Sequence, residues 1–322
     1  MKKKLFSLLL TAAMAVSLVA CGGGSGAGAS AGSDLRFVTG GESGTYYAFG
    51  SVIAQHATNN AGIKVVGIVG NGSQANVMEM EDGNAELAFC QSDVMAYAYE
   101  GKNLFEKPVT CFSTVAALYT EQVQIVTLDP SIQTVADLKG KKVSIGAAGS
   151  GVYFNAIDIL GVYGLTETDI EPTYQSFGDS ADALKDGKID AAFVVAGAPT
   201  TAITDLATTK QVSLVALDAE HIDKLLASSP YYTKCTITKD TYNTASDIET
   251  VGVGAVVLAK NDVPEDVIYK FVSDLFENAE SQVSAHAKYG ELNLDYATSI
   301  TSVPYHPGAA KYFEEKGYKV AK

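Results

Sequence analysis

The sequence predicts an α/β protein built as two similar lobes joined by a hinge. Three observations support this. Short β-rich runs alternate with stretches of helical periodicity, which is typical of α/β proteins with mainly parallel sheets. Two sequence patterns each occur twice at nearly the same offset. Two β-rich runs, Val123–Thr127 and Val251–Leu258, are placed where the chain would leave the first lobe and return to it.

The repeated patterns indicate lobes of similar construction. Ser43–Tyr46 (SGTY) recurs 107 residues later as Ser150–Tyr153 (SGVY). Asp82–Phe89 (DGNAELAF) recurs 104 residues later as Asp186–Phe193 (DGKIDAAF). Because the two offsets nearly agree, we expect each lobe to direct a glycine turn at a shared cleft, where helix N-termini would attract a small anion.

The first residues read as an export signal. Lys2–Lys4 is a basic segment, Leu5–Leu18 is an apolar run too short to span a bilayer comfortably, and the run ends in Leu-Val-Ala-Cys21. This resembles a bacterial lipobox, so we expect residues 1–20 to be a lipoprotein signal peptide. Cys21 would be the lipidated first residue, and glycine-rich residues 21–33 a flexible linker. The protein would then be extracytoplasmic and anchored to the outer face of the cell membrane. The alternative is an ordinary signal peptide with an incidental cysteine.

Charge and length limit the classes of partner. The net charge is −14, from 37 acidic and 23 basic side chains, whereas nucleic-acid binding requires a basic face. Removal of residues 1–20 would leave 302 residues, enough for one large or two medium domains. No later apolar run is long enough to cross a bilayer.

The cysteines after Cys21 do not indicate a metal site. Cys90, Cys111 and Cys235 lack a metal-binding spacing. An exported protein could form one disulfide, with Cys90–Cys111 as the candidate pair. Buried free thiols are the favoured interpretation.

In the first half, β-rich runs precede turns and helical stripes. The expected strands are 35–39, 64–69 and 87–90, and glycine turns follow the first two at 40–44 and 70–73. A helix follows with Phe49, Val52, Ile53 and His56 on one face, and a second runs through Ala75, Met78 and Met80. Ser92 and Asp93 are expected to cap a third helix.

The second half follows the same plan. The expected strands are 142–145 and 189–195, with a glycine turn at 146–151 and a closing turn at 197–199. Tyr153, Ala156, Ile157 and Leu160 form a helical stripe that Gly164 would end, and residues 181–185 are helical. The two crossings divide the chain into a first lobe of residues 34–125 plus 255–322 and a second lobe of residues 126–254. Helices near 264–285 and 307–316 would pack on the first lobe. A hinge of two crossings permits closure on a ligand.

The candidate binding site lies at the carboxyl ends of the strands, where open α/β sheets bind ligands. The turns there precede helices and offer free backbone N–H groups, and their glycines permit close approach. The only arginine, Arg36, begins the first strand and is therefore at the wrong end to clamp a carboxylate. Carboxylate binding would rest on backbone amides, hydroxyls and helix dipoles. The predicted ligand-binding residues are Gly44, Thr45, Tyr46, Ser73, Gln91, Ser92, Asp93, Ser150, Gly151, Val152, Tyr153, Gly197 and Pro199.

Some side chains of the site allow two interpretations. Tyr46 and Tyr153 follow the glycine turns and would either stack on a ligand or pack in the core. If the ligand carries an ammonium group, Asp93 is the best-placed acceptor, with Glu42 and Asp179 as further candidates. A simple helix-capping role for Asp93 is an equally good interpretation.

Catalysis has little support in the sequence. The four histidines form no HExxH motif, and neither GxSxG nor a phosphate-binding loop occurs. We therefore expect a binding protein and not an enzyme, with no cofactor and no metal.

Several segments together resemble the TAXI solute receptors of tripartite ATP-independent periplasmic (TRAP) transporters, from about Leu35 to Tyr318. They are Thr39–Gly50, Ala88–Asp93, Ala117–Tyr119, Val135–Val143, Gly146–Gly151, Lys185–Phe193, Ala196–Pro199 and His306–Ala310. The resemblance implies a two-lobed type II periplasmic-binding-protein fold. It also implies delivery of a small carboxylate, often glutamate or a related compound, to TRAP permease subunits driven by an ion gradient. The family's turn is usually Gly-Ser-Gly-Thr, and here Val152 replaces the threonine, which argues against strict glutamate specificity.

Other interpretations remain open at this stage. The nearest is a substrate-binding lipoprotein of an ABC importer with the same fold. An enzyme on a two-lobed scaffold would need a nucleophile–base pair, and a surface sensor without transport would bind no metabolite. We expect a monomer that binds a small carboxylate or amino acid.

Overall fold

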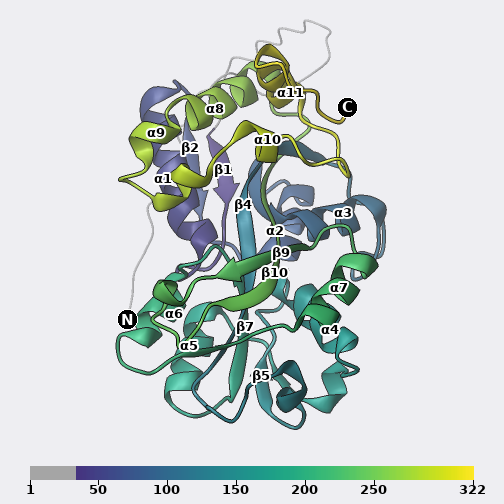
Figure 1. The fold of residues 1–322 in the computed structure, drawn as a ribbon. Helices are drawn as coiled ribbons and strands as arrows, with labels where there is room; N and C mark the ends of the chain where they lie inside the picture. The colour runs from purple at the N-terminus through teal and green to yellow at the C-terminus, as the bar shows by residue number, and fades with distance from the viewer. Residues whose placement is uncertain (1–33) are drawn as a thin grey trace, which may run out of the picture. The chain divides into compact units, whose positions relative to one another are not determined.

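A computed structural model describes residues 34–322, and the predicted signal peptide, Cys21 and the linker lie outside these residues. Each half of the chain begins with the same succession of strands and helices (Figure 1). In the first half these are β1 (Leu35–Val38), α1 (Thr45–Asn60), β2 (Val65–Ile68), α2 (Ser73–Glu81), β3 (Leu87–Gln91) and α3 (Ser92–Glu100). In the second half they are β5 (Lys142–Ser144), α4 (Val152–Val162), β6 (Glu171–Thr173), α5 (Phe177–Lys185), β7 (Ala191–Ala196) and α6 (Thr201–Ala207).

The remaining elements complete the two halves. They are β4 (Phe112–Thr127), β8 (Ser213–Val215), α7 (Ala219–Ser228), β9 (Thr233–Ile237), β10 (Ile248–Lys260), α8 (Glu265–Glu277), α9 (Ala279–Gln282), α10 (Leu294–Ala297) and α11 (Pro307–Glu315). Short 3₁₀ helices lie at Val135–Leu138, Glu167–Asp169, Lys239–Thr241 and Ala287–Glu291.

The strand order explains the sequence repeat. The sheet runs β2-β1-β3-β10-β4-β7-β5-β6. Read outward from its centre, each half has a long antiparallel strand followed by three mutually parallel strands in the same order, β3-β1-β2 or β7-β5-β6. The Ser43 and Ser150 turns therefore follow equivalent strands, β1 and β5. The repeated Asp-Gly segments lead into the equivalent strands β3 and β7.

The two crossings are longer than the sequence predicts. β4 has 16 residues and β10 has 13, and the two strands pair antiparallel over most of their length. A 16-residue strand spans about 50 Å, enough to belong to both lobes. The β4–β10 pairing shifts register between Ala255 and Val256 and again between Val257 and Leu258. Such irregularities bend and twist a strand pair.

The expectation of mainly parallel sheets is wrong for the middle of the sheet. β10 pairs antiparallel with β3, β4 and β9, and β4 pairs antiparallel with β7 and β8. One crossing leaves the first lobe while the other returns, so the two must run in opposite directions.

The hydrophobic core is divided between the halves. Around the first half of the sheet, one buried cluster gathers α1, α8 and α11, and another gathers α2 and α3. Around the second half, separate clusters gather α4 with α7 and α5 with α6. Helices thus cover both faces of each half, and α8 and α11 return to the first half as expected. The lobe boundaries at 125/126 and 254/255 stay predictions.

The cysteines of the described residues are free thiols. Cys90 is buried, and Cys111 and Cys235 are partly buried. The candidate Cys90–Cys111 disulfide is therefore absent from the structure, and Cys90 packs as a small apolar side chain in the first-lobe core. No helix within residues 34–322 combines the length and apolar character needed to cross a membrane.

Candidate functional site

A cavity between the two lobes gathers the amino ends of five helices. The residues that cap α1, α2 and α3 on the first lobe and α4 and α5 on the second all line it: Gly44, Gly72, Gln91, Gly151 and Ser176. The cavity contains about 650 Å³ of empty space, part of it open to solvent. The first-turn N–H groups of a helix have no intrahelical acceptor, and the helix dipole adds positive potential there. The cavity therefore has the backbone chemistry of an anion site.

Four of these five helices have no side-chain cap. Gly44, Gly72, Gln91 and Gly151 make no capping hydrogen bond through a side chain. The side chain of Ser176 does cap its helix, accepting from the Asp179 N–H. First-turn N–H groups at the uncapped ends are available to a bound molecule where no other group accepts from them; in α2 the Ala75 N–H already donates to the Gly149 carbonyl.

Close backbone approach explains one glycine on each side of the cleft. Gly72 has φ of +105°, in the region that favours glycine, and a Cβ there would lie 3.0 Å from the Cα of Ser150 across the cleft. A Cβ on Gly151 would lie 1.6 Å from Oε1 of Gln91, a distance no side chain could accommodate without displacement. Both glycine turns thus serve contact between the lobes as well as access to the cavity.

Direct hydrogen bonds hold the lobes together on one side of the cavity. The Ala75 N–H donates to the Gly149 carbonyl at 2.9 Å. Nε2 of Gln91 donates to Oδ1 of Asn155 at 3.1 Å, and Nδ2 of Asn155 donates to Oδ2 of Asp93 at 2.9 Å. These bonds join α2, β3 and α3 of the first lobe to the second.

The opposite side of the cavity has its own contacts. Oγ1 of Thr45 donates to the Gly197 carbonyl at 2.8 Å, and the Ala202 N–H donates to the Ser43 carbonyl at 3.2 Å. Nζ of Lys288 donates to the Ala198 carbonyl at 3.1 Å. With both sides bonded, this is a closed arrangement of the lobes.

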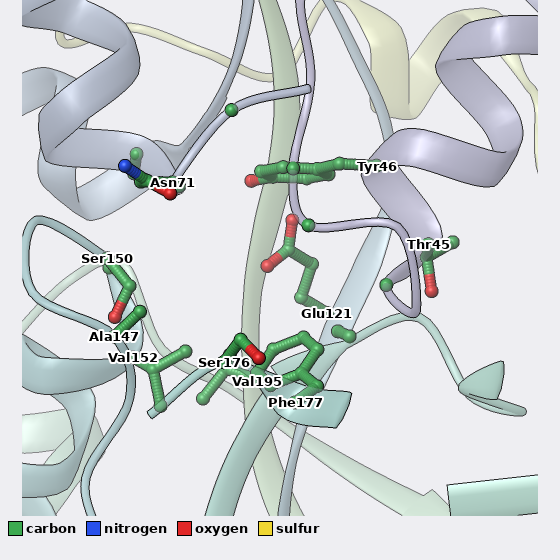
Figure 2. Close-up of a pocket in the computed structure, with 18 of the residues that line it drawn as sticks. Thr45, Tyr46, Asn71, Glu121, Ala147, Ser150, Val152, Ser176, Phe177 and Val195 are labelled. Carbon is green, nitrogen blue, oxygen red and sulfur yellow. The ribbon is translucent and has the colours of Figure 1, made fainter. Parts of the chain in front are cut away.

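The walls of the cavity differ in character. Tyr46 forms one side (Figure 2). Its ring is stacked on Phe89, at 4.5 Å between centroids and an interplanar angle of 10°. Val152, Phe177 and Val195 form an apolar surface on the second lobe. Glu121 of β4 lies between these walls, with its carboxyl group directed toward Tyr46.

The structure brings most predicted site residues together. Those that line the cavity are Gly44, Thr45, Tyr46, Ser73, Gln91, Ser150, Gly151 and Val152. Those outside the lining are Ser92, Asp93, Tyr153, Gly197 and Pro199. Their contact with a ligand stays a prediction in both groups.

The residues outside the lining have other partners. Oγ of Ser92 accepts from the Gly254 N–H at 2.9 Å. The Tyr153 hydroxyl donates to Glu167 at 2.9 Å. The Gly197 carbonyl accepts from Thr45, and Pro199 follows it in the turn after β7.

Asp93 differs most from its expected position. It does not cap α3, because the helix already begins at Ser92 and Gln91 takes the capping position. The Asp93 side chain is fully buried and accepts from Asn155. Burial raises its pKa to about 7. The predicted ammonium acceptor thus lies behind the lining and within the hydrogen bonds between the lobes.

Sequence reasoning missed several lining residues. They are Gly40, Gly41, Ser43, Gly70, Asn71, Gly72, Glu121, Ala147, Gln175, Ser176, Phe177, Val195 and Ala196, although Ser43, Gly72 and their neighbours fall in turns that the sequence marks. The start of α5 was detectable, since Ser176 followed by Asp179 is a helix-capping signature. Glu121 carried the clearest signal, as the single acidic residue of the segment Phe112–Thr127.

Arg36 and His56, which the sequence does not place in the binding site, have structural roles. Arg36 donates from Nε to Oε2 of Glu86 at 3.0 Å, and a second nitrogen donates to the Gly83 carbonyl at 2.7 Å. His56 pairs with Asp274 at 2.8 Å beside the first-lobe core. No group of three or more His, Cys, Asp or Glu side chains within residues 34–322 is arranged to hold a metal ion.

The fold and cavity define a two-lobed α/β protein with its candidate site between the lobes. The chain belongs to the NMT1-like family, whose model matches residues 37–317.

Solved structures of similar fold come from several bacteria. A protein from Bordetella bronchiseptica RB50 is 14% identical, with a TM-score of 0.52 over 80% of this chain and 76% of that one. The periplasmic aliphatic sulphonate binding protein SsuA from Escherichia coli is 17% identical, with a TM-score of 0.49 over 89% and 91%. A putative L-cystine ABC transporter protein from Listeria monocytogenes is 15% identical, with a TM-score of 0.48 over 82% and 98%. At such identities the similarity concerns the fold.

Proposed function

We propose that this protein is an extracytoplasmic solute-binding protein that captures a small carboxylate between its lobes and delivers it to a membrane permease. The observation that carries the proposal is the convergence of five helix amino ends on one cavity. Each helix dipole contributes about 0.3–1 kcal/mol to binding a negative charge, and up to ~2 kcal/mol when partly buried. Several such ends with neutral hydrogen bonds support affinities of about micromolar.

Hinge closure is the proposed mechanism. A carboxylate bound first to one lobe would gain contacts from the other, because the lining belongs to both. Such a ligand favours the closed population through its additional contacts there. β4 and β10 are the strands that connect the lobes and would accommodate the motion.

The proposed permease is of the TRAP type, and the proposed ligand is glutamate-like or a related organic acid. Support comes from the sequence resemblance to TAXI receptors over the folded body and from a cavity lining that contains no arginine. We further propose that Cys21 carries a lipid that anchors the protein to the outer face of the membrane. An ABC importer is the alternative partner, and the name of the Listeria protein is its motivation.

Mass spectrometry of a molecule retained through native purification, followed by calorimetry with that compound, tests the binding role. We expect a small carboxylate bound once per chain. Retention of no small molecule, together with no heat of binding from a panel of carboxylates and amino acids, would contradict the proposal and favour a surface sensor.

A transport assay distinguishes the two permease types. Uptake by cells that carry the protein and its permease should stop when the ion gradient is collapsed with an ionophore and should persist when ATP is depleted at a maintained gradient. The reverse pattern would identify an ABC importer.

A further inference from the structure

One buried carboxyl group faces the cavity with an unused oxygen. The Glu121 side chain is 2% exposed and lies on β4 among the cavity-lining residues. Its Oε2 accepts from Nε2 of Gln91 at 3.3 Å, whereas Oε1 has no hydrogen-bond partner. Figure 2 shows the carboxyl group in the open space between Tyr46 and Phe177. A buried hydrogen-bond acceptor without a donor lowers the stability of a protein, so such groups are normally paired.

The protein provides no cation inside the cavity to balance this group. No lysine, arginine or histidine is among the described residues that line it. The positive group that acts on the Glu121 pKa is Lys288, and its Nζ already donates to the Ala198 carbonyl and pairs with Glu291 at 2.5 Å. A charge buried without a partner is strongly unfavourable. Any cation that pairs with Glu121 in the cavity must therefore come from the bound molecule.

Other unpartnered atoms of the same cavity complete a site for an ammonium group. Oε1 of Gln91 and the hydroxyl groups of Tyr46 and Ser150 are buried and lack partners. An ammonium has three donors and no acceptor capacity. A carboxylate oxygen, an amide oxygen and a hydroxyl are the acceptors it requires, whereas a carboxylate would be repelled by an ionised Glu121.

We propose that the ligand is an α-amino acid, whose ammonium group binds Oε1 of Glu121 while its carboxylate binds the helix amino ends of the cavity. This inference rests on the proposed function and narrows its ligand class to carboxylates that carry an amine. It replaces Asp93 as the ammonium acceptor, because the Asp93 carboxyl group lies outside the lining. Glu42 and Asp179, the other candidates, are also outside it.

Calorimetry with matched pairs of compounds tests the proposal. The panel is the twenty common amino acids, and the best binder is then compared with the acid that has hydrogen in place of its amino group. We expect the des-amino acid to bind about 100-fold more weakly, since it leaves the buried carboxyl group unpaired. The variant Glu121→Gln should lose about 100-fold in affinity for the amino acid, and its affinity for the des-amino acid should be no lower than that of the wild type.

Two further variants control for folding. Glu249→Gln changes an exposed glutamate of β10 that pairs with Lys234, and its affinities should match the wild type. Glu121→Asp should keep the preference for the amino acid at reduced affinity. Thermal unfolding of each variant establishes that the compared proteins are folded.

The outcomes separate this inference from the proposed function. A wild-type protein that binds des-amino acids as tightly as amino acids would overturn the role of Glu121 and leave the carboxylate-binding function in place. An unchanged preference in a folded Glu121→Gln protein would do the same, and would indicate a protonated Glu121 that only donates a hydrogen bond. Failure to bind any member of either set would overturn both.

Proton release gives an independent readout. Burial raises the pKa of Glu121 to about 8, and the negative charge of Asp93 also acts to raise it. The neighbouring Tyr46 and Gln91 side chains and the positive charge of Lys288 act to lower it. The remaining titratable groups influenced by its charge are Cys90, Tyr119 and Tyr296. An ammonium that favours the ionised carboxylate should release a proton on binding near pH 7. Calorimetry in two buffers of different ionisation enthalpy should detect this release in the wild type and not in Glu121→Gln; equal release in both would contradict the ion pair.

Discussion

Gly151 of the second lobe lies directly against the side-chain amide of Gln91 of the first lobe. A Cβ at position 151 would fall 1.6 Å from Oε1 of Gln91 and 2.9 Å from Oγ of Ser73. In the observed arrangement of the lobes, position 151 therefore has room for the hydrogen atom of glycine and not for a methyl group. The position is a test of hinge closure that does not disturb either hydrophobic core.

We expect Gly151→Ala to weaken ligand binding by about 100-fold or more, because even partial opening removes the second lobe's hydrogen bonds. The larger Gly151→Val should abolish binding. Calorimetry measures the affinity, and small-angle scattering should show a more open particle. Circular dichroism should be unchanged.

Gly161→Ala is the matched control for this substitution. It lies on the same helix, α4, and a Cβ there meets nothing within 4 Å. Its affinity should equal the wild type. Full affinity in Gly151→Ala would show that the contact with Gln91 is dispensable for closure.

The Asn155 side chain makes three hydrogen bonds, and two of them, to Gln91 and Asp93, connect the lobes. Its amide oxygen accepts from Gln91, and its amide nitrogen donates to Asp93 and lies 3.0 Å from the Tyr232 hydroxyl. Asn155→Ala should lower the free energy of unfolding by about 1–3 kcal/mol, because it leaves buried polar groups unpartnered. Urea unfolding measures this. Asn60→Ala, at the exposed end of α1, should change it by less than about 0.5 kcal/mol; an equal loss in both variants would exclude a special role for Asn155.

Stability of the ligand-free protein should depend on the two buried carboxyl groups. Burial raises the pKa of Asp93 to about 7 and that of Glu121 to about 8, whereas both groups in the unfolded chain titrate near about 4. Between these values the folded protein holds protons that the unfolded chain has released. The free energy of unfolding should therefore fall as pH rises from about 4 to about 8 through this contribution.

Variants isolate that contribution from other titrating groups. Burial lowers the pKa of His286 and His306, which destabilises the fold in the opposite direction, as pH falls. Melting temperatures between pH 5 and 8 should decline less steeply in Asp93→Asn than in the wild type. Asp223→Asn, at an exposed position of α7, should keep the wild-type slope. Parallel slopes for all three proteins would contradict the assignment.

The single arginine of the chain should have no part in binding. The Arg36 side chain is 41% exposed and pairs with Glu86, and exposed pairs contribute about 0–1 kcal/mol. Arg36→Gln should keep the affinity for the amino acid within about twofold and cost at most a small loss of stability. A tenfold weaker affinity, measured by calorimetry, would mean that a cation reaches the ligand after all.

The lipid anchor has a direct test in cells. Cys21→Ser removes the acceptor thiol of the predicted lipobox. The variant should move from the membrane fraction to the soluble extracytoplasmic fraction, and incorporation of a labelled fatty acid should disappear. Cys235→Ser should remain in the membrane fraction. Membrane association that survives in Cys21→Ser would rule out the anchor.

Local pattern sufficed for much of the fold. Glycine turns followed by helical stripes predicted α1, α2 and α4 close to their observed starts, because a helix that begins at a glycine turn has a local signal. The recurrence of SGxY and DG at one offset predicted two similar halves, and the strand order of the sheet has that symmetry.

Pairing of distant strands decided the rest of the site. In the sequence Glu121 is one of several polar residues of a strand, and only the position of β4 between β10 and β7 places its carboxyl group at the cavity. Asp93 shows the converse: the helix begins at Ser92, two residues before the start that a cap at Asp93 would give, and the Asp93 side chain bonds to Asn155 outside the cavity lining.

By itself, the sequence determined the α/β alternation, the doubled architecture and the glycine turns, since each depends on residues close together in the chain. The tertiary structure alone decided which buried carboxyl group faces the cavity and which one holds the lobes together. That choice depends on the pairing of β4 with β10 and β7 and on the contact of Asp93 with Asn155, all between segments distant in the chain, and no local pattern encodes it.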